Sequence, residues 1–140
     1  MDAFLGAVWL YSADVERSTR FYRDTVGLTH IASEGGTEHF DCGNIRLSIH
    51  RGEPAPSGFF VFIVDDARAE YEEMRSRGVH FESEPHREEF GGLVAEFHDP
   101  DGHELFIWEL PGPDDEAYER ERPLVEHYRS LAAALGRRVS

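Results

Sequence analysis

The feature that most constrains this chain is a pattern that occurs twice along it. In each copy an apolar run is followed by an aspartate, an amphipathic segment with helical spacing and a glycine. The helical segments follow Asp14 and Asp66, whose carboxylates can accept hydrogen bonds from the free N–H groups of a first helical turn. Gly27 and Gly78 stand where a helix end favours glycine. The sequence therefore predicts a repeated β-α-β-β-β unit.

Short runs rich in β-branched and aromatic residues give the expected strands. In the first copy they lie at 7–11, 28–32, 38–42 and 45–50; in the second they lie at 59–64, 79–81, 94–98 and after Gly102. Between the last two, Pro100 fixes its own φ and Gly102 can take a positive φ, so residues 99–102 form a tight turn. The segment 52–58, rich in glycine and proline, is a linker between the copies.

Composition and charge limit the partners of this chain. Acidic residues number 28 against 14 basic ones, and a net charge of −14 argues against a nucleic-acid or anionic-membrane surface. Cys42, the single cysteine, excludes an internal disulfide and a cysteine-cluster metal site. The first residues do not form a signal-peptide pattern and no apolar run is long enough to span a membrane. We therefore expect a soluble, cytoplasmic protein.

The segment after residue 110 has a pattern of its own. Leu124, Tyr128, Leu131 and Leu135 recur at helical spacing, and Pro123 suits a first helical turn. The sequence predicts one amphipathic helix whose apolar stripe is buried on its own core or, less favoured, on a partner chain. The expected organisation is a single domain at 1–110, made of modules at about 5–52 and 58–110, followed by an extension at 111–140.

These motifs together resemble a known superfamily. Asp14 with the segment 18–23, Gly27-Leu28, Asp65-Asp66 and the turn 99–102 are similar to the vicinal oxygen chelate superfamily. Its members include glyoxalase I, bleomycin-resistance proteins, fosfomycin-resistance enzymes and extradiol dioxygenases. The resemblance covers residues 7–110 and implies an α+β fold, in which two β-α-β-β-β modules form curled sheets around a shared cavity. It also implies a homodimer.

The resemblance further implies four inward strand positions where metal-dependent members hold a metal ion with His, Glu or Gln. In this chain those positions are Ala7, Ser48, Phe59 and Phe106. A methyl group and two phenyl rings offer no donor atom, and a neutral hydroxyl is a poor one. We therefore expect no metal ion and no cofactor.

Side chains of a strand alternate between its two faces, so the same four positions indicate what lines the cavity. The resemblance, rather than this alternation, places Glu96 and His98 of the strand at 94–98 on the same face. The predicted ligand-binding residues are therefore Trp9, Tyr11, Arg46, Ser48, His50, Phe59, Glu96, His98, Glu104, Phe106 and Trp108. Aromatic rings with a few charged groups suit a flat, partly apolar ligand. Such rings can also hold a cation against their faces.

The favoured hypothesis is a metal-free small-molecule-binding protein of the bleomycin-resistance type. It would sequester an aromatic compound, with or without a positive charge, such as an antibiotic, and it has no catalytic residue. The alternative, less favoured, is an enzyme of the superfamily: a lyase, isomerase or oxygenase with a relocated metal site or metal-independent acid–base chemistry. His50, Glu96 and Glu104 would then be the catalytic candidates, and His50, Glu96 and His98 the relocated ligands. A structural or regulatory dimer with a vestigial cavity is the third hypothesis.

Overall fold

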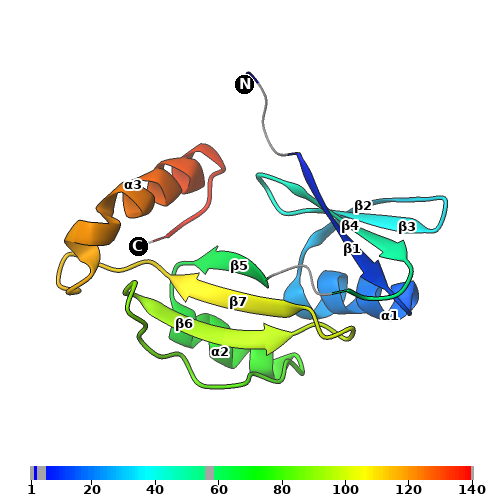
Figure 1. The fold of residues 1–140 in the computed structure, drawn as a ribbon, viewed down its shortest axis with the longest axis horizontal. Coiled ribbons are helices and arrows are strands. Elements are labelled where there is room, and N and C mark those ends of the chain that lie inside the picture. Colours follow the sequence, from blue (N-terminus) through cyan, green and yellow to red (C-terminus); the bar gives the residue numbers. More distant parts are fainter. Residues whose placement is uncertain (1, 3–5, 56–58, 140) are drawn as a thin grey trace. The chain divides into compact units, whose positions relative to one another are not determined.

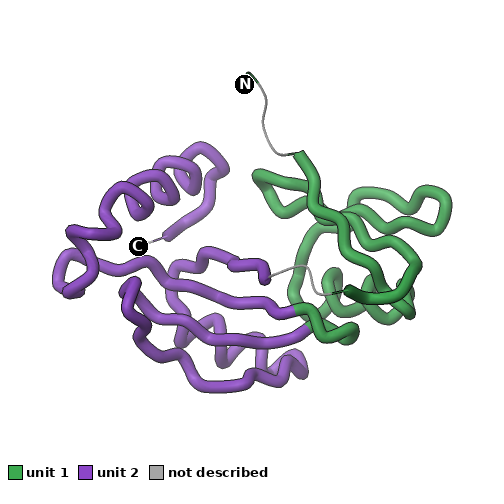
Figure 2. Tube along the Cα trace, in the orientation of Figure 1, with its two compact units in different colours: residues 1–58, 99–103 green, residues 59–98, 104–140 purple. Residues whose placement is uncertain are grey.

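The computed structural model describes residues 2, 6–55 and 59–139. As the sequence predicts, the fold is of the mixed α+β type, with two small sheets, helices and a C-terminal helix (Figure 1). The elements in chain order are β1 Ala7–Ser12, α1 Val15–Arg20, the π-helix η1 Phe21–Val26, β2 Thr29–Glu34, β3 Thr37–Asp41, β4 Arg46–Arg51, β5 Phe59–Val64, α2 Ala67–Ser76, β6 Leu93–His98, β7 Glu104–Glu109 and α3 Tyr118–Ala134. Two compact units divide the chain: unit 1 comprises 1–58 and 99–103, and unit 2 comprises 59–98 and 104–140 (Figure 2).

The described strands of unit 1 form a sheet in the order β1-β4-β3-β2. β1 runs parallel to β4, and the other neighbours are antiparallel. One face of this sheet is buried with α1 and η1, through side chains such as Leu10, Ile49, Phe40 and Tyr22. The predicted cap is present, because the Asp14 carboxylate accepts a 3.0 Å hydrogen bond from the N–H of Arg17.

The predicted helix after Asp14 changes its hydrogen-bonding pattern halfway. Residues 15–20 are α-helical, whereas 21–26 form a π-helix, which ends at Gly27 with a φ of 92°. π-Helical segments are rare and helical periodicity does not reveal them. Tyr22 in this segment is fully buried.

The described strands of unit 2 form a sheet in the order β5-β7-β6. β5 runs parallel to β7, and β6 is antiparallel to it. The expected strand at 79–81 is wrong, because this stretch contributes only an isolated bridge between Phe81 and Phe97. A second isolated bridge joins His86 to Val94. Residues 82–85 separate the two bridges on this side, whereas only residues 95–96 separate them on β6, so a continuous ladder does not form there.

The C-terminal helix is present, but it begins earlier than expected and buries a different face. It starts at Tyr118 and includes Pro123 in its interior. Val125 and Ala132 are buried, whereas Leu124 and Leu135 are 45% and 36% exposed. The prediction that both leucines are buried is therefore wrong, since the helix packs on Val94 and Trp108 through Val125 instead. None of the helices in the described residues is long and apolar enough to cross a lipid bilayer.

Candidate functional site

The candidate site lies on one face of the unit 2 sheet. Strand register and alternation place nine side chains on this face in three cross-strand rows. The rows, each written from β6 through β7 to β5, are His98, Glu104, Phe59; Glu96, Phe106, Val61; and Val94, Trp108, Ile63. On the opposite face, Leu105, Ile107 and Phe97 are buried in the core.

The third row is covered by α3. Val94 and Trp108 form one apolar cluster with Val125 of the helix, and Tyr128 packs against that cluster. Trp108 is only 8% exposed, and its indole N–H donates to the carbonyl of Gly91 at 3.0 Å. The first two rows are left accessible, and we call their six residues the open face: Phe59, Val61, Glu96, His98, Glu104 and Phe106.

One half of the open face is apolar. Phe59 is 60% exposed and Val61 is 44% exposed, although both lie on the strand β5. The rings of Phe59 and Phe106 meet edge to face, with their centroids 5.1 Å apart. Leaving large apolar groups in water costs free energy, so this half gains from any apolar surface that covers it.

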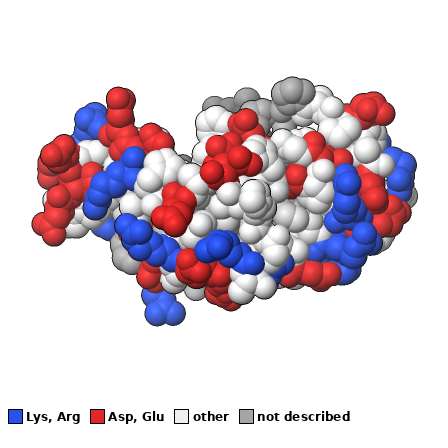
Figure 3. Space-filling view, turned by 90° about the horizontal axis from the view of Figure 1, so that it is seen from below, with Lys and Arg blue, Asp and Glu red and all other residues white. Residues whose placement is uncertain are grey.

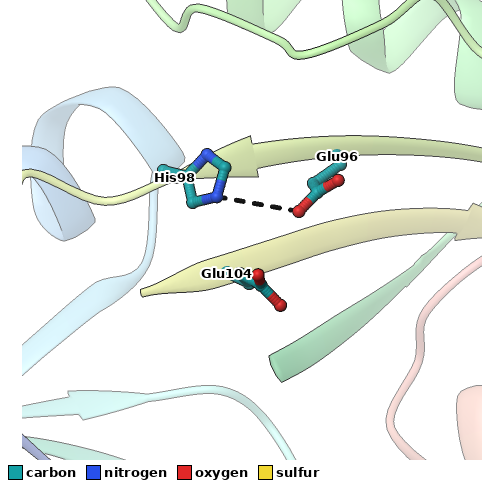
Figure 4. A group of neighbouring side chains, drawn as sticks. All are labelled: Glu96, His98 and Glu104. Carbon is teal, nitrogen blue, oxygen red and sulfur yellow. Dashed lines mark ion pairs between the residues drawn. The ribbon is translucent and has the colours of Figure 1, made fainter. Parts of the chain in front are cut away.

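The other half is polar, and Figure 4 shows its three side chains close together. Nε2 of His98 lies 3.6 Å from Oε1 of Glu96, and Nδ1 of His98 lies 3.0 Å from Oε1 of Glu82. Glu96, His98 and Glu104 each offer one ligand atom, and these atoms all lie within 4.8 Å of one another. This arrangement can bind a cation or exchange a proton.

The negative charge of the polar half is not balanced by arginine. Among the described residues, the ion pairs of Glu96 involve only His98, and Glu104 takes part in none. The one face of the molecule seen in Figure 3 has acidic side chains between the arginines, without a continuous basic area. With the net charge of −14, the open face is suited to positively charged partners.

The other predicted site residues belong to unit 1. Trp9 and Tyr11 are 58% and 47% exposed, and the imidazole of His50 lies 4.4 Å from the Trp9 ring between centroids. Nδ1 of His50 contacts the hydroxyl of Thr37 at 3.1 Å, while its Nε2 is buried without a hydrogen-bond partner among the described residues. Arg46 is exposed at the start of β4.

The structure therefore divides the predicted ligand-binding set between the units. Unit 1 holds Trp9, Tyr11, Arg46, Ser48 and His50; unit 2 holds Phe59, Glu96, His98, Glu104, Phe106 and Trp108. The relocated ligand set of the enzyme hypothesis is divided in the same way: Glu104, rather than His50, accompanies Glu96 and His98. The binding roles themselves stay predictions.

The four positions at which the superfamily holds its metal do not fit an ion in this chain. Ala7 offers a methyl group, and Phe59 and Phe106 offer rings that contact each other. The hydroxyl of Ser48 is buried and hydrogen-bonded to Nδ1 of His39 at 2.7 Å. Two hydrocarbon rings, a methyl group and an engaged hydroxyl do not make a coordination sphere.

Three residues that contact the predicted site residues were missed from the sequence. Thr37 and His39 contact His50 and Ser48, and their alternation along 37–41 is a signal that could have placed them on that face. Glu82, which contacts His98, stands outside the named strands, where strand alternation gives no signal.

Unit 2 also has a surface hollow away from the open face. It encloses about 990 Å³ between the 87–90 loop and the start of α3. Its arginines are already engaged, since Arg87 pairs with Asp115 at 2.6 Å and Arg120 donates to the carbonyl of Glu89. Hydrogen bonds from the N–H groups of Gly92 and Ala117 lower the pKa of Asp115 below its usual range. We therefore interpret Asp115 as an anchor between β6 and α3.

Comparison with curated proteins and solved structures gives consistent matches. The chain is 28% identical to the uncharacterized protein YraH of Bacillus subtilis (strain 168), over 69% of this chain and 91% of that one. Its fold is similar to TnmS3, an antibiotic binding protein from Streptomyces sp. CB03234 (TM-score 0.69, 22% identity, 79% of this chain and 97% of that one). It is also similar to a lactoylglutathione lyase from Agrobacterium tumefaciens (TM-score 0.60, 25% identity, 77% and 93%).

A family model covers most of the chain. The model described as Glyoxalase/Bleomycin resistance protein/Dioxygenase superfamily matches residues 4–107, which extend from before β1 into β7 and include the turn between β6 and β7. The chain therefore belongs to the glyoxalase/bleomycin resistance protein/dioxygenase superfamily.

Proposed function

We propose that this protein binds a small, flat aromatic compound on the open face of unit 2, without a metal ion at the four superfamily positions. The observation that carries the proposal is the exposed Phe59 ring, in edge contact with Phe106 and beside the carboxylates of Glu96 and Glu104. An aromatic pair next to carboxylates that no arginine neutralises is typical of a surface that binds a small ligand.

The apolar half supplies binding free energy. A flat ring laid on Phe59 and Val61 removes their exposed apolar area from water, which contributes roughly 25 cal/mol for each Å². Each well-placed ring pair adds about 0.5–1.5 kcal/mol beyond this burial. Phe59 and Val61 project from β5, which is hydrogen-bonded to β7, so little ordering of the backbone is needed on binding.

The polar half supplies orientation. An ammonium or amidinium group on the compound would form charge-assisted hydrogen bonds with Glu96 and Glu104, which are stronger than neutral ones. A neutral ring would forgo this gain. Compounds that combine a flat ring with a positive group are therefore the favoured class, and neutral rings are the weaker one.

Sequestration of an antibiotic is the physiological role that we infer from this binding. TnmS3, whose fold this chain shares, is described as an antibiotic binding protein. A sequestering protein needs only tight binding, because it lowers the free concentration of its ligand by mass action. This role is compatible with the lack of metal-donor groups at the four superfamily positions.

A second candidate is an enzyme of the same superfamily that uses acid–base chemistry. The observation that favours it is the contact of His98 with Glu96, opposite Glu104, because these groups can exchange protons at a bound substrate. Incubation of the full chain with lactoylglutathione, followed by mass spectrometry, tests one lyase activity. Turnover by the wild type that is lost in Glu104→Gln would favour the enzyme over the binding protein.

The binding proposal is tested by calorimetric titration of the full chain in the presence of a chelator. Proflavine serves as the planar cation and coumarin as the neutral ring. We expect both to bind, proflavine more tightly, and Phe59→Ala to weaken both by about tenfold, which is about 1.4 kcal/mol.

Phe90→Ala is the matched control, because Phe90 is another exposed phenylalanine of unit 2 that lies outside the open face. Its binding constants should equal those of the wild type. Absence of binding by both probes, or equal effects of the two substitutions, would overturn the proposal.

A further inference from the structure

We propose that Glu96, His98 and Glu104 form a binding site for one divalent transition-metal ion. The site differs from the four superfamily positions, which lack donor groups, and none of its three residues occupies one of them. It goes beyond the proposed function, because a neutral ring can bind the apolar half of the open face whether or not an ion is present.

The strands place the three donors within reach of one ion. His98 lies directly opposite Glu104 in the β6–β7 pairing, and Glu96 precedes His98 by two residues on the same face. Their ligand atoms lie within 4.8 Å of one another. Bonds of about 2.1 Å to a common ion require donor atoms about 3–3.5 Å apart. Rotation of the glutamate side chains is enough to close the remaining distance.

The orientation of His98 supports the proposed metal site independently of the carboxylates of Glu96 and Glu104. Its Nδ1 contacts Oε1 of Glu82 at 3.0 Å, which leaves Nε2 directed toward Glu96 (Figure 4). A histidine that binds a metal through one ring nitrogen commonly gives its other N–H to a carboxylate. Glu82 is therefore a positioning residue, since it fixes the imidazole without contacting the ion.

The charge balance of the site also indicates a cation. The chain contains 14 arginines, yet the ion pairs of the described residues join none of them to Glu96 or Glu104. Glu96 is only partly exposed, at 30% of its side chain. Carboxylates in such a position gain from a bound positive charge more than fully hydrated ones do.

The donor chemistry selects the ion. One imidazole nitrogen with two carboxylate oxygens suits manganese, iron or zinc better than calcium or magnesium, which prefer oxygen alone. Three protein donors leave coordination positions free for an oxygen of a ligand. The ion-loaded protein would therefore prefer rings with anionic oxygens, such as salicylate, whereas the metal-free protein would prefer rings with a positive group.

The test is a calorimetric titration of the chelator-treated full chain with manganese chloride and zinc chloride. We expect one ion per chain, and at least 100-fold weaker binding in Glu104→Gln and in His98→Asn. Glu82→Gln should weaken binding by about tenfold, as expected for a carboxylate that orients a ligand. Electron paramagnetic resonance of the manganese form reports the bound ion directly.

The matched control is His86→Asn. His86 contacts Glu88 at 2.8 Å, so it is a second histidine–glutamate pair of unit 2 outside the site, and its loss should leave metal binding unchanged. Circular dichroism checks that each variant is folded. Binding weaker than about 1 mM, or equal binding by wild type and Glu104→Gln, would overturn the inference. Coumarin binding by the metal-free protein depends on Phe59 and not on Glu104, so either proposal can fail without the other.

Discussion

The hydroxyl of Tyr22 donates a 2.7 Å hydrogen bond to the carboxylate of Asp99, which lies 77 residues later in the chain. Tyr22 is 0% exposed and Asp99 is 6% exposed. Asp99 also accepts hydrogen bonds from the N–H groups of Asp101 and His103, so it organises the turn that connects β6 to β7. The π-helix η1 and this turn are thereby joined, which accounts for the grouping of residues 99–103 with unit 1.

Removal of the Tyr22 hydroxyl should destabilise the fold substantially. Tyr22→Phe leaves the buried Asp99 carboxylate without one of its donors, and hydrogen bonds to charged groups contribute about 1.5–3 kcal/mol. We expect a loss of this size in the free energy of unfolding, measured by urea denaturation. Tyr118→Phe, on the partly buried start of α3, is the control and should change stability little. Equal stability of Tyr22→Phe and wild type would contradict this role.

Asp101 should make the fold sensitive to acid. Burial alone would raise the pKa of Asp101, but hydrogen bonds from Ser12, Ser18 and the N–H of Ala13 lower it below its ordinary value of 3.8. The unfolded chain therefore binds this proton more readily than the folded one. The stabilisation is present above pH 3.8 and is lost as the pH falls through the lower folded value.

This pH dependence can be measured on one variant pair. Unfolding free energies of the wild type should fall between pH 4 and pH 2 more steeply than those of Asp101→Asn. Ser18→Ala, which removes a 2.8 Å hydrogen bond to Asp101, should lie between the two. Parallel curves for all three proteins would show that the Asp101 carboxylate does not contribute.

The helix α3 should stabilise unit 2 through one face only. Val125 is 0% exposed against Trp108, whereas the adjacent Leu124 is 45% exposed. Val125→Ala should lower the unfolding free energy by about 2 kcal/mol, because it removes buried methyl groups and leaves a cavity. Leu124→Ala should change it by less than about 0.5 kcal/mol. A larger effect of Leu124→Ala would indicate that the leucine is covered in the assembled protein.

Cys42 should be unreactive in the folded protein. Burial, together with the neighbouring Asp41 carboxylate, raises the pKa of its thiol to about 11. At pH 8 roughly one thiol in a thousand is then ionised, and the thiolate is the reactive form. Labelling with a disulfide reagent at pH 8 should be slow for the folded chain and fast in urea. Rapid labelling without denaturant would contradict this environment.

The repeat, the helix caps and the alternation of side chains between strand faces could be predicted, because each is visible in short stretches of sequence. Asp14 and Asp66 cap their helices as expected, and alternation placed Glu104 on the same face as Phe106. Both inferences depend on residues close in sequence. The resemblance to the superfamily was needed to place Glu96 and His98 on that face as well.

The parts that could not be predicted depend on tertiary contacts. Packing decides which face of α3 lies on Trp108. From the sequence, the larger leucines nearby suggested the buried face, and nothing marked Ala132 as buried. The contact of Glu82 with His98 joins a loop to a strand 16 residues later. The change to a π-helix at Phe21 is a choice between backbone hydrogen-bond partners that side-chain periodicity does not record.

The most direct test of the proposed binding site is a nuclear magnetic resonance titration of the 15N-labelled, metal-free full chain with coumarin. We expect the largest amide shifts in β5 and β7, at Phe59, Val61, Glu104 and Phe106, with small shifts in α2 on the covered side of the sheet. Phe59→Ala should reduce these shifts at equal coumarin concentration. Shifts confined to the hollow between the 87–90 loop and α3, or no shifts at coumarin concentrations that saturate calorimetric binding, would contradict it.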